Sequence, residues 1–190
     1  MMKLNRTEKP QVLKDNWKQW TKDYLNTNTW NTSWHNKHEK LLTELKVMSG
    51  KHCAFCDELL FDLANEDGQI EHFRNKSQYK CLAYAWQNLY PICDKCNKKK
   101  SKKNIVNLVK PDEKNYEFAD WFRFDLASFE LKLNKFNKNW KRAEAIINLY
   151  KLNDEDKVDR RKIEFDKIKK AKFSLQGTIG LLSKYNITIE

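Results

Sequence analysis

The amino-acid sequence predicts an α+β protein in which a small zinc-stapled core is flanked by N-terminal and C-terminal helices. Three observations lead to this prediction. Apolar residues recur at helical spacing toward both ends of the chain, two Cys-x-x-Cys pairs bound its middle third, and short segments of alternating polarity follow the second pair. Glycine and proline number only 4 and 3 among 190 residues, so no flexible linker is expected to divide the chain.

Two helices are predicted ahead of the cysteines. The first covers residues 12–25, and the second covers 32–48 with Gly50 as a C-cap just beyond its end. Their apolar residues recur at helical spacing and are expected to face a core: Leu13, Trp17, Trp20, Tyr24, Leu25, Trp34, Leu41, Leu42 and Leu45. The tryptophans can also stack on bases, but at this spacing such residues are more often core. His35 and His38 lack a third ligand and are assigned to the surface.

The last part of the chain is predicted to contain strands and then helices. Apolar and polar residues alternate over 122–125 and 129–134, which is typical of two short strands. Helical spacing returns over 138–151, and one or two more helices are expected over 155–184. The chain is therefore divided into three parts: an N-terminal helical segment (1–50), a core that carries the cysteines (51–104), and a strand pair with C-terminal helices (105–190).

The chain is strongly basic. Lysine and arginine total 37 against 26 for aspartate and glutamate, a formal net charge of +11 that suits a polyanionic partner such as a nucleic acid. Only six of the basic residues are arginine, and a lysine bias can also come from an AT-rich coding sequence, so composition alone leaves both explanations open. The distribution is more informative, because six lysines gather on or just after the second cysteine pair: Lys95, Lys98, Lys99, Lys100, Lys102 and Lys103.

Membrane insertion and secretion are not expected. No apolar run approaches the ~18 residues that a membrane-spanning helix needs. Residues 1–10 also lack the apolar core of a signal peptide. We therefore expect a cytoplasmic protein with no membrane partner.

Four of the five cysteines form two pairs, Cys53 with Cys56 and Cys93 with Cys96. Four thiolates at this spacing match a tetrahedral Zn²⁺ site of the structural kind. Disulfides and buried free thiols are the alternatives, and disulfides are not expected in a cytoplasmic protein. Cys81 stands apart and is expected to be a small buried residue.

A carboxylate stands directly before a histidine between the two cysteine pairs, in the segment IEHFRNKS. Glu71 offers a hard oxygen ligand, and His72 carries an imidazole whose ordinary pKa near neutrality suits proton transfer. The pair is expected at the end of a strand. Asn88 and Asn97 follow at the second cysteine pair, which makes the combination more informative than a Glu-His dipeptide by itself.

These residues resemble the HNH, or ββα-metal, nuclease family. In that family a two-stranded hairpin and a helix hold one divalent cation against the scissile phosphate, and Glu71-His72, Asn88 and Asn97 occupy the motif positions. The closer resemblance is to the PtuB-like HNH nucleases of Septu-type and retron-associated anti-phage defence systems. Five segments carry it: KLNR, CAFC, EHFR-x-KS, YAWQNLYPICDKCN and INLYKLN.

The resemblance extends from Lys3 to about Arg161 and is strongest over 53–103. Asn75 departs from it, because the group usually has proline after the arginine of EHFR. The resemblance implies a zinc-stapled ββα-metal core as the fold of the middle segment. It also implies an ATPase subunit of the same defence system as a partner.

The chemistry of phosphodiester cleavage suggests a role for each motif residue. His72 is the candidate general base for an attacking water, and the resemblance implies that a backbone carbonyl binds its other ring nitrogen. Glu71 and the side-chain oxygen of Asn97 are expected to hold the cation, and oxygen ligands favour Mg²⁺ or Mn²⁺ over Zn²⁺. The resemblance gives Asn88 an orienting role across the hairpin.

Several basic residues are candidates for binding nucleic acid. Arg74 and Lys76 either grip phosphates beside the cut or are exposed loop charges. Lys100 lies three residues after Asn97 on one helix face and is expected to approach the phosphate. General attraction to the backbone is assigned to the remaining lysines of the cluster: Lys98, Lys99, Lys102 and Lys103.

The sequence thus predicts a metal-dependent HNH endonuclease, a hydrolase that cleaves DNA phosphodiester bonds as the effector of a defence system. The alternative is a non-catalytic zinc-ribbon module that binds nucleic acid. The lysine cluster and the cysteine pairs suit either function. Only the Glu71, His72 and Asn97 combination favours the enzyme.

Overall fold

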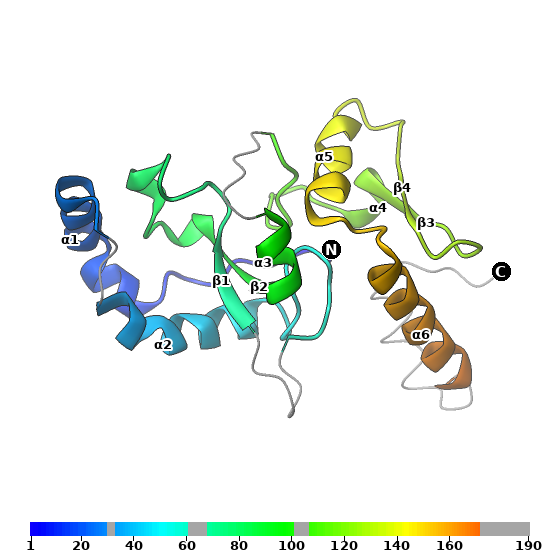
Figure 1. Cartoon of the computed structure of the whole chain (residues 1–190), viewed down its shortest axis with the longest axis horizontal. Helices are drawn as coiled ribbons and strands as arrows, with labels where there is room; N and C mark the ends of the chain where they lie inside the picture. The colour runs from blue at the N-terminus through cyan, green and yellow to red at the C-terminus, as the bar shows by residue number, and fades with distance from the viewer. Residues whose placement is uncertain (30–32, 61–67, 101–106, 172–190) are drawn as a thin grey trace. The chain divides into compact units, whose positions relative to one another are not determined.

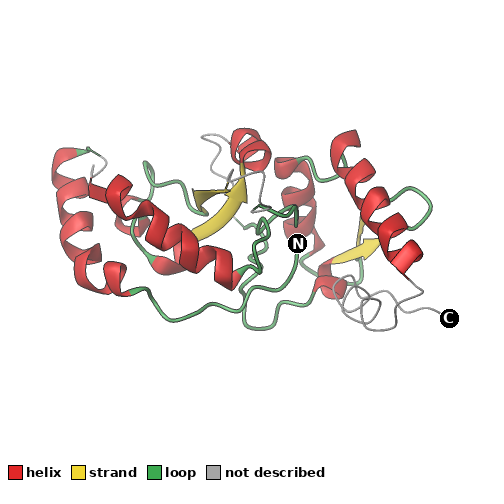
Figure 2. Cartoon of the chain, turned by 90° about the horizontal axis from the view of Figure 1, so that it is seen from below, coloured by secondary structure: helices red, strands yellow, loops and turns green. Residues whose placement is uncertain are grey.

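The computed structural model describes residues 1–29, 33–60, 68–100 and 107–171, with the side chains of 33–40 and of Ala171 left aside (Figure 1). The chain folds into two compact units, Lys3–Val106 and Asn107–Glu190. Each unit combines helices with one two-stranded antiparallel sheet (Figure 2). The α+β class predicted from the sequence is therefore observed, whereas the predicted boundaries after residues 50 and 104 stay a prediction.

The helix α1 spans Gln11–Thr27 and packs by its Trp20 on Tyr84, with 5.3 Å between the ring centroids. Leu13, Trp20 and Tyr24 are buried, as their helical spacing predicts. Leu25 differs from the prediction, because its side chain is 50% exposed. It follows Tyr24 directly and is turned about 100° away from the buried stripe.

The helix α2 spans Ser33–Met48. Leu41, Leu42 and Leu45 are buried, which confirms that part of the predicted inner face. Gly50 follows the helix with a left-handed φ of +58°, the backbone conformation that favours glycine at a helix C-terminus. The side chains of Trp34, His35 and His38 lie outside the described ones.

A hairpin and a short helix form the centre of the first unit. Strand β1 (Gly68–His72) pairs antiparallel with β2 (Leu89–Cys93), and α3 (Asp94–Lys100) follows β2 without a loop. His72 lies opposite Leu89 at one end of the ladder, and Gly68 lies opposite Cys93 at the other. Two 3₁₀ turns, η1 (Lys80–Leu82) and η2 (Trp86–Asn88), connect the strands.

The N-terminal segment is anchored on this hairpin through Arg6. Its Nη1 donates to the carbonyls of Trp86 (2.6 Å) and Leu89 (2.9 Å), and its guanidinium lies 4.5 Å from the Tyr90 ring centroid. Trp86 returns a hydrogen bond from Nε1 to the Thr7 carbonyl at 3.0 Å. Residues before α1 therefore help to hold the turn that leads into β2.

The second unit contains the two strands that alternation predicts, β3 (Phe122–Phe124) and β4 (Leu131–Leu133), in antiparallel register. The helix α4 (Phe118–Trp121) precedes them, and α5 (Trp140–Tyr150) follows as predicted. The helix α6 spans Glu155–Ala171, and the rest of the helical range predicted up to residue 184 lies outside the described residues. No helix among the described residues is long and apolar enough to cross a membrane.

Candidate functional site

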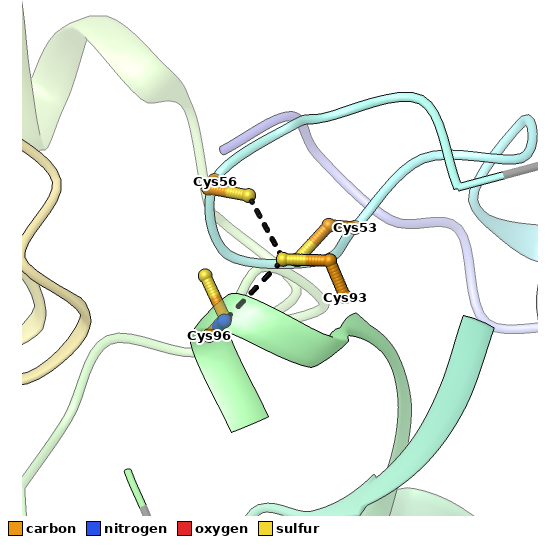
Figure 3. A group of neighbouring side chains, drawn as sticks. All are labelled: Cys53, Cys56, Cys93 and Cys96. Carbon is orange, nitrogen blue, oxygen red and sulfur yellow. Dashed lines mark hydrogen bonds between the residues drawn. The ribbon is translucent and has the colours of Figure 1, made fainter. Parts of the chain in front are cut away.

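The four paired cysteines come together in the first unit. Cys53 and Cys56 lie in a loop whose Ala54 amide donates to the Pro91 carbonyl of β2 at 2.9 Å. Cys93 ends β2 and Cys96 lies in the first turn of α3. Their sulfurs all lie within 4.8 Å of one another and converge on one point (Figure 3).

This cluster fits a zinc ion. Zn–S bonds of about 2.3 Å in a tetrahedron place sulfurs about 3.8 Å apart, and the Cys56 and Cys93 sulfurs are separated by 3.6 Å. The cysteines are not joined as disulfides. Burial raises the pKa of the Cys53 thiol, and hydrogen bonds with the other three sulfurs add to that shift, so a thiolate here needs a cation. The predicted ligand set is therefore one that can bind zinc.

Cys81 differs from its prediction. It lies on the η1 turn and is exposed, whereas a buried residue was predicted. An isolated cysteine carries no local signal of its burial, because no periodic segment includes it. It takes no part in the four-cysteine cluster.

Glu71 and His72 are the last two residues of β1, at the strand end where the prediction places them. Successive side chains of a strand point to opposite faces, so the two groups leave the strand in different directions. Both are buried, each with 8% of its surface exposed. A carboxylate and an imidazole that are this buried require fixed partners.

The partner of His72 is the carbonyl oxygen of Ala83, 2.9 Å from Nε2. A carbonyl only accepts, so Nε2 carries the proton and Nδ1 the lone pair. Burial, together with the positive charges of Lys76 and Lys100, lowers the pKa of His72 to about 3. The imidazole is therefore neutral at pH 7. A backbone carbonyl holds Nε2, as the resemblance implies, and this leaves Nδ1 as the basic nitrogen.

The partner of Glu71 is Lys100, the last residue of α3. The Lys100 Nζ donates to the Glu71 carboxylate and to the carbonyls of His72 (2.5 Å) and Phe73 (3.0 Å). Burial raises the pKa of Glu71 and lowers that of Lys100, while the charge of each group offsets part of the other's shift. The ion pair is thus a desolvated one.

Lys100 therefore departs from its predicted position near a phosphate. Only 2% of the residue is exposed, and its three acceptors belong to the end of β1 and the residue that follows it. Helical spacing places Lys100 on the Asn97 face, as predicted, but that face lies against β1 and not against solvent.

Asn97 occupies the same face one turn earlier. Its Nδ2 donates to the side-chain oxygen of Gln69, which is two residues before Glu71 on β1. Residues i and i+3 of a helix and residues i and i+2 of a strand each share a face. The helix α3 therefore lies along one face of β1, with Asn97 on Gln69 and Lys100 on Glu71. Gln69 was missed at the sequence level, although strand alternation places it beside Glu71.

Asn88 ties the loop after β1 to the start of β2. Its Oδ1 accepts from the Arg74 amide at 2.7 Å, and its Nδ2 donates to the carbonyls of Arg74 and Leu82, both at 3.0 Å. These hydrogen bonds connect the two segments, and the orienting role that the resemblance implies for Asn88 stays a prediction.

The candidate basic residues fall into different environments. Arg74 is half-buried, with its guanidinium 5.7 Å from the Tyr79 ring centroid, and its buried Nη1 has no hydrogen-bond partner in the described part of the chain. Lys76 is half-buried close to Glu71 and His72, since its charge shifts the pKa of both groups. Lys98 and Lys99 are exposed, and Lys98 pairs with Asp94. Lys102 and Lys103 lie outside the described residues.

The predicted cation ligands are not assembled around a common point in the way the cysteines are. Within the described residues, the four cysteines are the one group of three or more His, Cys, Asp or Glu side chains that are close enough to share an ion. Glu71 is bound by Lys100, and the Asn97 amide by Gln69. A catalytic Mg²⁺ or Mn²⁺ thus stays a prediction.

Comparison with known proteins shows one relevant similarity. The chain is 30% identical over 137 residues to the Septu protein PtuB of Bacillus thuringiensis. The matched residues make up 70% of this chain and 51% of that protein, so the chain spans about half the length of the relative. No family model matches the chain. The similarity supports the resemblance to the PtuB-like group that the cysteine and Glu-His segments indicate.

Proposed function

We propose that this protein is a metal-dependent endonuclease of the HNH type and the nuclease effector of an anti-phage defence system. One observation carries the proposal: a buried, neutral histidine with its tautomer fixed by Ala83 stands beside a carboxylate at the end of β1. The hairpin and helix that position this pair carry the four-cysteine cluster. Similarity to a Septu protein supports the defence role.

In this proposal three residues of the chain have separate roles in phosphodiester cleavage. His72 accepts a proton from the attacking water at Nδ1, which requires no prior deprotonation because the ring is already neutral. Arg74 offers its buried Nη1, which has no acceptor among the described residues, to a phosphate oxygen. Asn88 holds the Arg74 backbone in place through two hydrogen bonds.

Two metals are proposed, with separate ligands. Zinc on Cys53, Cys56, Cys93 and Cys96 fixes the loop before β1 to α3, a structural role. Glu71 and the Asn97 side-chain oxygen are the proposed ligands of Mg²⁺ or Mn²⁺, which supplies charge stabilisation at the phosphate when bound. Release of the Glu71 carboxylate from Lys100 is then part of cation binding.

The partners are proposed as DNA and an ATPase subunit of the same system. The positive charge and the exposed Lys98 and Lys99 support a nucleic acid. The similarity to the Septu protein PtuB supports a partner protein from the same kind of system.

The second candidate function is a zinc-ribbon module that binds nucleic acid without cleaving it. The Lys100–Glu71 pair favours this candidate, because a carboxylate neutralised by a buried lysine needs no cation. The two candidates differ in whether His72 matters for anything beyond folding.

A plasmid-nicking assay with Mg²⁺ distinguishes the two functions. We expect wild-type protein to nick DNA, alone or with the ATPase, and His72→Gln to lose at least a hundredfold in rate while it retains zinc and helical content. Gln78→Ala, an exposed change in the same loop, is the matched control and should cut normally. Nicking by His72→Gln at the wild-type rate would rule out the proposed base, and binding without cleavage under every metal condition would favour the zinc-ribbon module.

A further inference from the structure

A cluster of basic and aromatic side chains lies on the second unit, whereas the residues proposed for cleavage belong to the first. The segment KFNKNWK leads from the end of β4 into the first turn of α5 and contributes Lys135, Phe136, Lys138, Trp140 and Lys141. Arg123 of β3 joins it, because its guanidinium lies 5.2 Å from the Phe136 ring centroid. These six residues are called the basic aromatic surface below.

Phe136 is the most unusual member of this surface. It is 86% exposed, more than any other large hydrophobic residue of the described chain. Such an exposure gains nothing for folding, because the apolar surface of the ring stays in contact with water. Arg123 and the lysines at 135, 138 and 141 are exposed as well, and Trp140 is half-buried.

The segment that presents Phe136 is well tied to the fold. Asn134 donates from Nδ2 to the Ala119 carbonyl at 2.8 Å, and Asn137 donates from Nδ2 to the Asp120 carbonyl at 3.0 Å. The Phe136 amide donates to the Asn134 side-chain oxygen at 3.2 Å. Phe136 is therefore held out toward solvent by a hydrogen-bonded turn, which lowers the entropy cost of binding a ligand there.

Three positively charged side chains lie over the two rings. Lys135 and Lys141 lie 5.7 Å and 6.0 Å from the Trp140 ring centroid. No aspartate or glutamate occurs between Leu131 and Ala143 in the sequence. Arg123 also lies directly opposite Lys132 in the strand register, where Glu130 pairs with the Lys132 ammonium group. The surface thus presents an excess of positive charge that suits an anion.

We propose that the basic aromatic surface binds a single strand of nucleic acid. Bases stack on Phe136 and Trp140, and phosphates lie against Arg123, Lys135, Lys138 and Lys141. Cations that follow a backbone beside rings that stack on bases are the features shared by proteins that bind single strands. A paired duplex offers no free base faces to an exposed ring. A protein partner is less well matched, because lysine is depleted at protein interfaces.

This proposal goes beyond the proposed function and does not rest on it. Binding at the second unit can hold whether or not the first unit cleaves DNA. Fluorescence anisotropy of the full chain with labelled 20-nucleotide single-stranded DNA, single-stranded RNA and duplex DNA tests it, with no Mg²⁺ added so that cleavage does not contribute.

Two variants and two matched controls are compared in that assay. Phe136→Ala removes a stacking ring, and Leu126→Ala removes another exposed apolar side chain of the same unit. The triple change of Lys135, Lys138 and Lys141 to Gln removes three charges. The same change at Lys162, Lys167 and Lys170 removes three exposed charges from α6.

We expect Phe136→Ala to weaken single-strand binding about tenfold and duplex binding much less, because stacking requires an unpaired base. The triple change at the surface should also reduce the salt slope of log K by about 2, since single strands contribute about 0.7 per phosphate contact. Both controls should bind like wild type. Equal losses in the two triple variants, or full single-strand affinity in Phe136→Ala, would overturn the proposal. A variant that binds every oligonucleotide normally but no longer binds the ATPase subunit would overturn it in favour of a protein interface.

Discussion

Lys100 and Glu71 form a buried ion pair that joins the end of α3 to the end of β1. The same ammonium group binds the carbonyls of His72 and Phe73, so one side chain fixes the backbone of the candidate base and of the residue that follows it. Lys100, which the sequence predicts near a phosphate, is therefore a buried residue that holds Glu71 and the adjoining backbone in place. In the proposed function, this pair must open before the Glu71 carboxylate can bind a cation.

Removing one partner of this pair should be strongly destabilising, because it leaves a buried charge without compensation. We expect Lys100→Met to lower the free energy of unfolding by about 3–5 kcal/mol in urea denaturation. Lys99→Met, the exposed neighbour, should change it by less than about 0.5 kcal/mol. The double change of Lys100→Met with Glu71→Gln should recover part of the loss, and strict additivity of the two single changes would mean that the residues do not interact.

The four-cysteine cluster predicts one zinc ion per chain. Replacing Cys56 by Ser should remove most bound zinc and destabilise the first unit, because structural zinc contributes about 10–16 kcal/mol of apparent binding energy to small folds. Metal analysis of purified protein and thermal unfolding measure the two effects. Cys81→Ser is the matched control, since Cys81 is exposed and lies outside the cluster. Equal zinc content in both variants would contradict the ligand assignment.

The low pKa of His72 predicts a dependence of stability on pH. The folded-state pKa of about 3 is lower than the ordinary value of 6.5, so between these values the unfolded chain binds a proton that the folded chain does not. This contribution to stability is fully present above about pH 6.5 and is lost as the pH falls toward 3. Urea denaturation across that range should show a steeper loss in wild type than in His72→Gln, and parallel curves would contradict the buried neutral state.

The exposed lysines of α3 predict a local dependence of DNA binding on charge. Replacing Lys98 and Lys99 by Gln should reduce the salt slope for duplex binding by about 2, since each phosphate contact contributes about 0.9. Replacing Lys162 and Lys167, which are exposed on α6, removes the same charge and should leave the slope nearly unchanged. Similar slopes in the two double variants would mean that net charge alone drives binding.

Spacing in the sequence is enough to locate most elements of this fold. The periods of helices and strands predict α1, α2, α5 and the β3–β4 hairpin, because side-chain direction repeats locally along each element. The two Cys-x-x-Cys pairs likewise predict the cluster at which four sulfurs meet. The orienting role of Asn88 rests on its motif position and stays a prediction.

Only the tertiary structure decided which element each helix or strand face packs against. The sequence by itself places Asn97 and Lys100 on one helix face, but packing turns that face onto β1, so that Lys100 pairs with Glu71 instead of meeting a ligand. Contacts between residues that are not neighbours in the sequence also pair His72 with the Ala83 carbonyl. In the same way they anchor the N-terminal segment through Arg6 on the Trp86 carbonyl. The physical reason is that periodicity specifies direction relative to one element's own axis, while burial and pairing depend on which element lies against it.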